Sequence, residues 1–152
     1  MSVADSNADS VREFITALEA NELETAASFL HEQFMFSGWT PQPLNKRDFL
    51  SVIKDLKEGI PGLIFNLHNL AEHENAVTGT IQVAGYQSDS FILPVLGTPP
   101  IPQTATSISL PAENVSFTFE NGLILQWLVQ HVEGGGIRGL IRQLGFDLPI
   151  VQ

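Results

Sequence analysis

The chain has 152 residues, of which 43% are hydrophobic and only 16% are charged. This length and composition predict a single globular domain over 1–152 with a substantial core, in which the polar residues 1–9 are flexible. Seven Lys and Arg against 17 Asp and Glu give a net charge of −10, which argues against nucleic acid and against an anionic membrane as partners. The acidity favours neutral or cationic ligands only weakly, because its simplest role is solubility.

Several site types are not expected from this sequence. It contains no cysteine, so disulfides and thiolate chemistry are excluded. Its first ten residues do not resemble a secretory signal, and no apolar run approaches the ~18 residues of a membrane span, so a soluble cytoplasmic protein is expected. Glycine-rich phosphate-binding motifs are absent, and the histidines lack compact spacing. We therefore expect no cofactor and no metal.

The first third of the chain predicts three helices and one short strand. A capping box that starts at Ser10 predicts a helix over 10–20, and a second start signal at Asn21 predicts another short helix. A short strand is expected at 34–37, and Asn45 is the expected N-cap of the third helix. Apolar residues recur at helical spacing: Val11, Phe14, Ile15 and Leu18, then Phe49, Val52, Ile53 and Leu56.

From residue 62 the apolar period changes to two. Strands are predicted over 63–72 and 76–86, and again over 104–119 with a break at Pro111. The segment 89–103 between them is irregular, apolar and rich in proline. We expect it to cover a cavity mouth or a partner surface.

The last part of the chain predicts a hairpin, a long strand and a closing helix. Asn121-Gly122 lies between two apolar runs and accepts positive φ at both positions, which predicts a type I′ turn. Helical spacing predicts a short helix over 137–144 after the glycine run at 134–136. Alternation places these residues on apolar strand faces: Val115, Phe117 and Phe119 before the turn, and Leu123, Leu125, Trp127, Val129 and His131 after it.

The element order favours an α+β fold. Helices come first and long strands follow, so N-terminal helices packed on an antiparallel sheet, with a short C-terminal helix, are expected. Glycine interruptions at Gly79 and Gly85 favour a strongly curved sheet, shaped as a cone with an apolar interior.

The chain resembles the nuclear transport factor two-like superfamily, and within it the SnoaL-like polyketide cyclases of the ketosteroid isomerase-like branch. The residues that carry the resemblance, in order, are the Val11–Leu30 helix pair, Gly97–Pro100, Phe119–Ile124, Gln126-Trp127 and Gly139–Gly145. The resemblance implies a cone-shaped α+β barrel, a deep apolar pocket and homodimers that form through the sheet. It does not fix a function, because members include cyclases, isomerases, dehydratases, epoxide hydrolases and binding domains.

His131 is the candidate catalytic residue. In SnoaL-like cyclases an acid/base Asp lies on the last strand, four residues after the Trp, and this chain has His131 there. An imidazole also transfers protons near neutral pH, although a rim histidine bonded to a backbone carbonyl is the alternative.

Four further residues are candidates for ligand binding: Trp39, Tyr86, Trp127 and His68. The aromatic residues could line a cavity, but core packing explains them equally well. His68 is expected to face either the pocket or a dimer partner. Asp89 and Glu113 flank the proline-rich segment, and either could reach a pocket, although solvated loop positions are the simpler interpretation.

Two functions are consistent with this sequence. The first is a small acid–base enzyme of the isomerase, cyclase or lyase type, in which His131 moves a proton on an apolar carbonyl compound and Tyr86 or Asp89 stabilises the enolate. The second is a non-catalytic module that holds an apolar small molecule or a protein in the same cavity.

Overall fold

The computed structural model describes residues 6–147. Its elements are α1 (Asn7–Glu19), α2 (Leu23–Ala27), β1 (Leu30–Ser37), β2 (Leu44–Asn45), α3 (Lys46–Gly59), β3 (His68–His73), β4 (Ala76–Ile81), β5 (Ala84–Tyr86), the short 3-10 helix η1 (Pro94–Leu96), β6 (Ser107–Ser109), β7 (Glu113–Glu120), β8 (Leu123–Val129) and α4 (Gly136–Gln143). Within this described part, no helix is long and apolar enough to cross a membrane.

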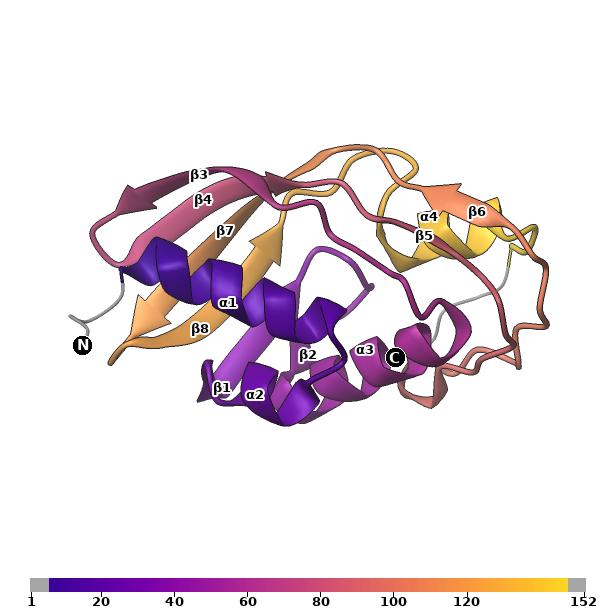
Figure 1. Ribbon diagram of the computed structural model, residues 1–152, viewed down its shortest axis with the longest axis horizontal. Helices are drawn as coiled ribbons and strands as arrows, with labels where there is room; N and C mark the ends of the chain where they lie inside the picture. Colours follow the sequence, from indigo (N-terminus) through magenta and orange to yellow (C-terminus); the bar gives the residue numbers. More distant parts are fainter. Residues whose placement is uncertain (1–5, 148–152) are drawn as a thin grey trace.

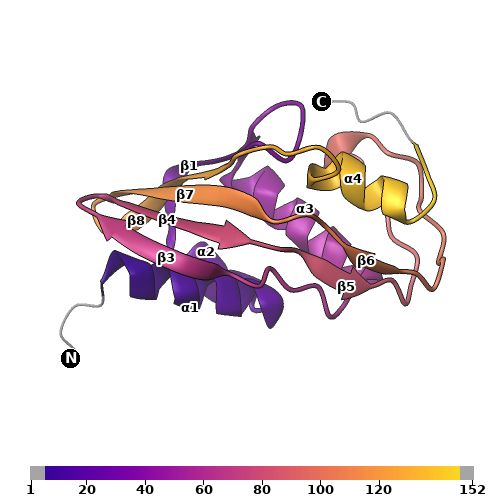
Figure 2. The same ribbon diagram turned by 90° about the horizontal axis from the view of Figure 1, so that it is seen from above.

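The fold is mixed α+β, as predicted. Six strands form one sheet in the order β2-β1-β8-β7-β4-β3, and β5 pairs with β6 in a second, two-stranded sheet. Helices α1 and α3 pack on one face of the large sheet (Figure 1). α4 lies beside β6, at the opposite end of the molecule from the start of α1 (Figure 2).

The expectation of a purely antiparallel sheet is wrong, because β1 pairs with β8 in parallel. Parallel neighbours require a crossover connection, and here most of the chain separates the two strands. Periodicity within a strand carries no information about its distant partner, so the parallel pair was not predictable from alternation. The other pairs in the large sheet are antiparallel.

The predicted helices exist, but the first one starts earlier than expected. The side chain of Ser6, not Ser10, accepts a hydrogen bond from the backbone N–H of Asp9, so α1 begins at Asn7. Of the segment 1–9 that was expected to be flexible, residues 7–9 are helical and 1–5 lie outside the described residues. Asn45 caps α3 as predicted, since its side chain accepts from the N–H of Asp48.

The predicted strands are present but shorter and divided. In place of the predicted strand over 63–72, only His68–His73 forms a regular strand, and Ile64 makes an isolated bridge to Ala84. The segment 76–86 divides into β4 and β5, and the last predicted run divides into β6 and β7 around Pro111. The first strand, β1, begins at Leu30 and is longer than the predicted 34–37.

The hairpin between β7 and β8 has the predicted turn but also an unpredicted bulge. Asn121 and Gly122 have φ of 53° and 79°. Thr118 pairs with Gln126 but Phe119 pairs with Ile124, so Leu125 is an extra residue in β8. The extra residue reverses the alternation. Ile124 therefore shares the buried face of β8, and the expected placement of Leu123 and Leu125 on that face is wrong.

Trp127 lies at the centre of an aromatic core between the sheet and the helices. It has no exposed surface. Five rings surround it, with centroids at 4.9 to 5.9 Å from that of Trp127: Phe36, Phe117, Phe65, Phe49 and Phe14.

The proline-rich segment is ordered by its own contacts. Phe91 and Ile101 form a bridge across it, and the ring of Phe91 packs against Gly59 at the end of α3. Gln87 is fully buried at the base of the segment. Its amide nitrogen donates to the carbonyl groups of Asp89 and Pro102, and its oxygen accepts from Thr104. The segment thus covers α3 and part of the core.

Candidate functional site

A hollow of about 380 Å³ lies where the loop after β1, the end of β8 and the start of α4 meet. It is lined by Gly38, Trp39, Thr40, Pro41, His131, Gly135, Gly136 and Arg138. A smaller hollow of about 290 Å³ adjoins it and shares His131, Gly135 and Arg138 with it. Three parts of the chain that are distant in sequence therefore build one site.

Gly38 lets the loop after β1 approach the end of β8. Its φ is 104°, and a Cβ at this position would lie 1.9 Å from the backbone oxygen of Val129. Only glycine accepts that conformation and that contact. The next residue, Trp39, accepts a hydrogen bond at its backbone oxygen from the N–H of Ile137, at 3.1 Å. The loop and the first turn of α4 are thereby held together.

Glu113 is the buried acid of the site. It begins β7 on the inner face of the sheet and is 1% exposed. Its Oε1 accepts a hydrogen bond of 3.0 Å from the indole Nε1 of Trp39, whereas Oε2 has no partner among the described residues. Oε2 lies 2.5 Å from the position that a Cβ on Gly135 would occupy, so the missing side chain of Gly135 makes room for the carboxyl group.

Burial raises the pKa of Glu113, and the hydrogen bond from Trp39 and the charge of His131 partly oppose this rise. His131 is exposed, follows the end of β8 and lines both hollows. The imidazole of His131 at the hollow therefore influences the buried carboxyl group electrostatically, although no hydrogen bond joins the two described side chains. This combination can accept a proton from a bound molecule and return it.

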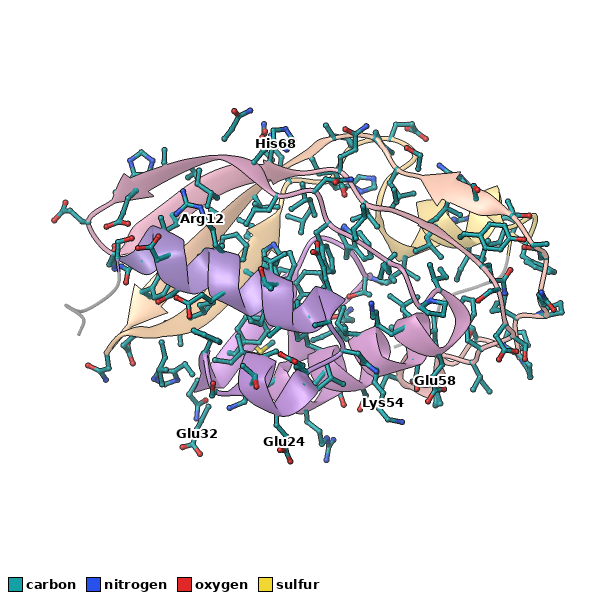
Figure 3. The ribbon with its side chains drawn as sticks, viewed as in Figure 1. Arg12, Glu24, Glu32, Lys54, Glu58 and His68 are labelled. Atoms are coloured by element: carbon teal, nitrogen blue, oxygen red, sulfur yellow. The ribbon has the colours of Figure 1, made fainter. Side chains whose placement is uncertain are left out.

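The structure brings together two of the five residues proposed from the sequence, Trp39 and His131. Trp127 lies in the aromatic core, where its Nε1 has no hydrogen-bond partner among the described residues. Tyr86 is 50% exposed on β5 and lines a separate hollow of about 580 Å³. His68 is exposed on β3 (Figure 3), and its Nδ1 lies 2.7 Å from the backbone oxygen of Asn66.

Of the two interpretations of Glu113 from the sequence, the simpler one, a solvated loop residue, is wrong, because its side chain is buried. The alternation of Val115, Phe117 and Phe119 contained the signal, because it places residue 113 on the same inward face. Asp89, the other acid near the proline-rich segment, is exposed as expected and accepts a hydrogen bond from the N–H of Ser90.

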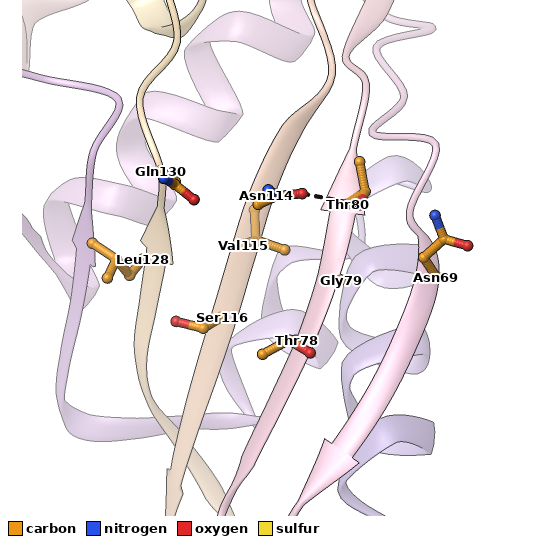
Figure 4. Close-up of a pocket in the computed structure, with 9 residues that line it drawn as sticks. All are labelled: Asn69, Thr78, Gly79, Thr80, Asn114, Val115, Ser116, Leu128 and Gln130. Atoms are coloured by element: carbon orange, nitrogen blue, oxygen red, sulfur yellow. Dashed lines mark hydrogen bonds between the residues drawn. The ribbon is translucent and has the colours of Figure 1, made fainter.

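A third hollow, of about 710 Å³, lies on the face of the sheet that the helices leave uncovered (Figure 4). It is lined by Asn69, Thr78, Gly79, Thr80, Asn114, Val115, Ser116, Leu128 and Gln130. None of these nine residues carries a formal charge. The hydroxyl group of Thr80 and the side-chain oxygen of Asn114 are 3.4 Å apart, so neighbouring strands contribute adjacent polar groups.

Metal ligation has no candidate cluster in the part of the chain that the structure describes. No group of three or more His, Asp or Glu residues between 6 and 147 is arranged to hold an ion.

The model of the SnoaL-like domain matches residues 11–127. No curated protein matches the chain. Among solved structures, AclR from Streptomyces galilaeus is similar with a TM-score of 0.69 at 13% identity, over 91% of this chain and 95% of AclR. An LEH-like epoxide hydrolase from M. tuberculosis is similar with a TM-score of 0.65 at 14% identity, over 91% of each chain.

TsrD from Streptomyces laurentii has a TM-score of 0.67 at 17% identity, over 95% of this chain and 98% of TsrD. At these identities the likeness concerns the fold alone. The similar structures extend over nearly the whole of this chain and of their own, so the described fold is the common feature.

Proposed function

Because this chain belongs to the SnoaL-like family, we propose that it is an acid–base enzyme of the cyclase or isomerase type. The proposed substrate is a small carbonyl compound with an apolar body, bound in the hollow beside Trp39. The observation that carries the proposal is the buried Glu113, whose carboxyl group accepts a hydrogen bond from Trp39 behind the hollow that His131 lines. We also propose that the protein acts in the cytoplasm.

In the proposed reaction, an imidazole nitrogen of His131 removes a proton from the carbon next to the carbonyl group. The substrate becomes an enolate and His131 becomes an imidazolium ion. The same proton then returns to a different carbon in an isomerase, or to the new oxygen after ring closure in a cyclase. Glu113 acts as a positioning residue, because its negative charge stabilises the imidazolium and Trp39 fixes the carboxyl group.

We also propose that the sheet and helices form the cone-shaped barrel that the family resemblance implies. In this proposal the aromatic cluster around Trp127 fills the interior of the cone, and the ligand binds in the hollow beside Trp39, at the mouth of the cone. Apolar contact comes from Trp39 and Pro41, while Gly38, Gly135 and Gly136 leave room for a planar molecule.

Deuterium exchange tests the proposal without knowledge of the natural substrate. 2-Tetralone is a compact apolar ketone with acidic protons next to its carbonyl group. We expect the protein to accelerate the exchange of these protons for deuterium, measured by proton NMR, by about 100-fold or more over buffer. His131→Ala should remove the acceleration, and His68→Ala, which changes an exposed histidine on another strand, should retain it.

Equal acceleration by His131→Ala and by the unchanged protein would refute the role of His131. Glu113→Gln should reduce the rate while leaving the Kd for 2-tetralone nearly unchanged, since it alters the partner of the base and not the walls of the hollow. A variant that loses binding as well as turnover would contradict a positioning role.

A second candidate function is a non-catalytic binding module. The dense aromatic packing around Trp127 favours it, because such a core leaves only the outer hollows for a ligand. In that case, 2-tetralone would bind and stabilise the protein against heat, while its exchange rate would stay at that of buffer. The exchange experiment therefore separates the two functions.

We also propose that two copies associate through the uncovered face of the sheet. Two chains of net charge −10 repel each other, so their contact surface must be nearly free of charge. The hollow on that face has no charged lining residue, and Leu128 is 43% exposed within it. Met35 on the neighbouring strand β1 adds a second exposed apolar side chain.

Sedimentation velocity tests this association. Ser116→Glu places a carboxylate on the uncovered face, and in a two-fold dimer each copy brings its own, so dissociation into monomers is expected. Thr16→Glu is the matched control, since it adds the same charge at an exposed position of α1 on the opposite face. A monomeric unchanged protein, or a dimer that survives Ser116→Glu, would refute the sheet interface.

A further inference from the structure

The segment between β5 and β6 carries an exposed surface that the proposed function does not use. No charged residue and no histidine occurs between Asp89 and Glu113, although the chain has a net charge of −10. The proline-rich segment 89–103 runs along the end of the molecule opposite to the start of α1 (Figure 1). A partner can cover an uncharged surface without removing water from charged side chains. This part of the chain is therefore suited to a protein contact.

The sequence restricts the backbone of residues 98–102 to an extended conformation. Three of these five residues are proline, whose ring holds φ at about −65°. The other two, Thr98 and Ile101, each precede a proline, which disfavours the helical region for them. In the structure, Ile101 forms an antiparallel bridge with Phe91, and none of the residues 98–104 has a positive φ. These restrictions favour the polyproline II helix, which has three residues per turn.

Burial along residues 98–104 repeats with the same period of three. Thr98 and Ile101 are buried and Thr104 is half-buried, whereas the residues between them are exposed. One edge of a three-sided polyproline helix therefore packs on the protein, and the other two edges face outward. These two edges form the proline ridge, which consists of Pro99, Pro100, Pro102 and Gln103.

The proline ridge is held in place from within the fold. The carbonyl group of Pro102 accepts a hydrogen bond of 2.9 Å from the buried amide group of Gln87, and Thr104 donates to the same side chain. Pro99 and Pro100 make no hydrogen bond among the described residues, as expected of polyproline II, so their carbonyl oxygens can accept from a partner. Because the ridge is already ordered, little conformational entropy is lost when a partner binds it.

We infer that the proline ridge is the docking site of a partner protein whose groove is lined by Trp and Tyr side chains. Aromatic-lined grooves bind polyproline II segments because the proline rings pack between the aromatic rings. The N–H group of Trp and the O–H group of Tyr can donate to the free carbonyl groups of Pro99 and Pro100. A groove of rings without charge also matches a ridge without charge. No residue of the ridge lines the hollow beside Trp39, so the inference is independent of the proposed reaction.

An isolated WW domain that binds Pro-Pro-Leu-Pro segments is the probe, since residues 99–102 read Pro-Pro-Ile-Pro. The isotope-labelled WW domain is titrated with the intact protein and followed by NMR, and we expect the resonances of its aromatic groove to shift in a saturable manner. The double variant Pro99→Ala, Pro102→Ala should raise the Kd about tenfold or more, although it keeps the carbonyl group that Gln87 binds. Pro94→Ala is the matched control and should leave the Kd unchanged, because it removes an exposed proline of the same segment outside the ridge. Thermal melting checks that both variants are folded.

A synthetic peptide of residues 97–104 shows whether the ridge is recognised in its folded form. The intact protein should bind the WW domain several-fold more tightly than the peptide, because the fold holds the ridge in the bound conformation. Binding of the peptide but not of the protein would overturn the inference, since the domain would then need the buried edge at Thr98 and Ile101. Binding of neither would do the same, and so would an unchanged Kd of the double variant.

A second copy of the chain is the alternative occupant of the ridge. Sedimentation velocity of the protein alone distinguishes the two, since the double variant should sediment like the unchanged protein if the partner is a different protein. A lower sedimentation coefficient of the double variant would assign the ridge to contact between copies and overturn the inference. Deuterium exchange of 2-tetralone should proceed equally in both proteins, because the ridge is separate from the hollow beside Trp39.

Discussion

Replacing Trp39 by Phe should destabilise the protein through Glu113 and not only through lost packing. The change removes the N–H group that Oε1 of Glu113 accepts, and Oε2 has no partner among the described residues. A hydrogen bond to an ionised group contributes roughly 1.5–3 kcal/mol, against about 1 kcal/mol for a neutral pair. We therefore expect Trp39→Phe to lower the free energy of unfolding by about 2 kcal/mol at neutral pH, in addition to the packing loss.

A double-mutant cycle with Glu113→Gln isolates this contribution. Glutamine keeps an oxygen that can accept from Trp39 but carries no charge, so only the charge-assisted part of the bond is lost. The two substitutions should therefore show a coupling energy of about 1 kcal/mol. Urea unfolding followed by far-ultraviolet circular dichroism measures all four proteins, because this signal does not depend on the tryptophan that is removed.

The coupling should depend on pH in a defined direction. The pKa of Glu113 in the folded protein is raised above its ordinary value of 4.5, chiefly by burial. The folded chain thus holds this proton more tightly than the unfolded chain. The contribution of this bound proton to the free energy of unfolding is complete below pH 4.5 and is lost as the pH rises through the pKa of Glu113 in the folded protein. Glu113→Gln should therefore gain stability relative to the unchanged protein as the pH rises.

The same ionisation creates the charge-assisted bond, so the coupling with Trp39 should be small at about pH 4 and reach its full value at about pH 8. A coupling energy near zero at both pH values would refute the indole–carboxylate bond. A coupling that is large and equal at both would show that the bond exists but that Glu113 does not ionise in this range.

Three further substitutions test how the site and its frame are built. Gly38→Ala should lower the free energy of unfolding by about 3 kcal/mol or more, because alanine would have to adopt a positive φ and its Cβ would clash with β8. Gly62→Ala is the control, since open space surrounds Gly62, and its effect should stay within about 0.5 kcal/mol. Thermal melting compares the two variants. Asn45→Ala removes the cap of α3 and should cost about 1 kcal/mol, seen as a fall in Tm of roughly 2–4 °C. Lys57→Met removes two hydrogen bonds to backbone carbonyl groups near the ends of α1 and α3 and should cost about 2 kcal/mol in urea unfolding, while Lys54→Met, at an exposed position of the same helix, should cost little.

The sequence predicted those features of the fold that depend on neighbouring residues alone. The cap at Asn45 and the turn at Asn121-Gly122 depend on one or two residues, and both were correct. The bulge at Leu125 was not predictable, because Leu123 to Trp127 has no glycine or proline that marks an interruption. The parallel pairing of β1 with β8 likewise depends on tertiary contacts alone.

Only part of the candidate site could be predicted from the sequence. His131 was proposed from its place four residues after Trp127 on the last strand, although β8 ends at Val129, and Trp39 was proposed from its residue type. Glu113 was missed because a charged residue near Pro111 suggests a loop, and because the indole group that satisfies it comes from a distant part of the chain. The role of Gly135 was missed for the same reason. A glycine run in a sequence suggests a flexible connection, and only the structure shows that the carboxyl group of Glu113 occupies the place of a Gly135 side chain.

The amide group of Gln87 has a consequence for how this protein can vary. It joins the two ends of the proline-rich segment, at Asp89 and at Pro102 to Thr104, and so closes the segment at its base. A change in the length of the segment between Asp89 and Pro102 therefore leaves β5 and β6 in place. Doubling the length of such a loop costs only about 0.6 kcal/mol in closure entropy. The exposed Pro99-Pro100 tip is therefore a position where new sequence, including a peptide tag or a reporter, can be inserted with the sheet and the hollow beside Trp39 unchanged.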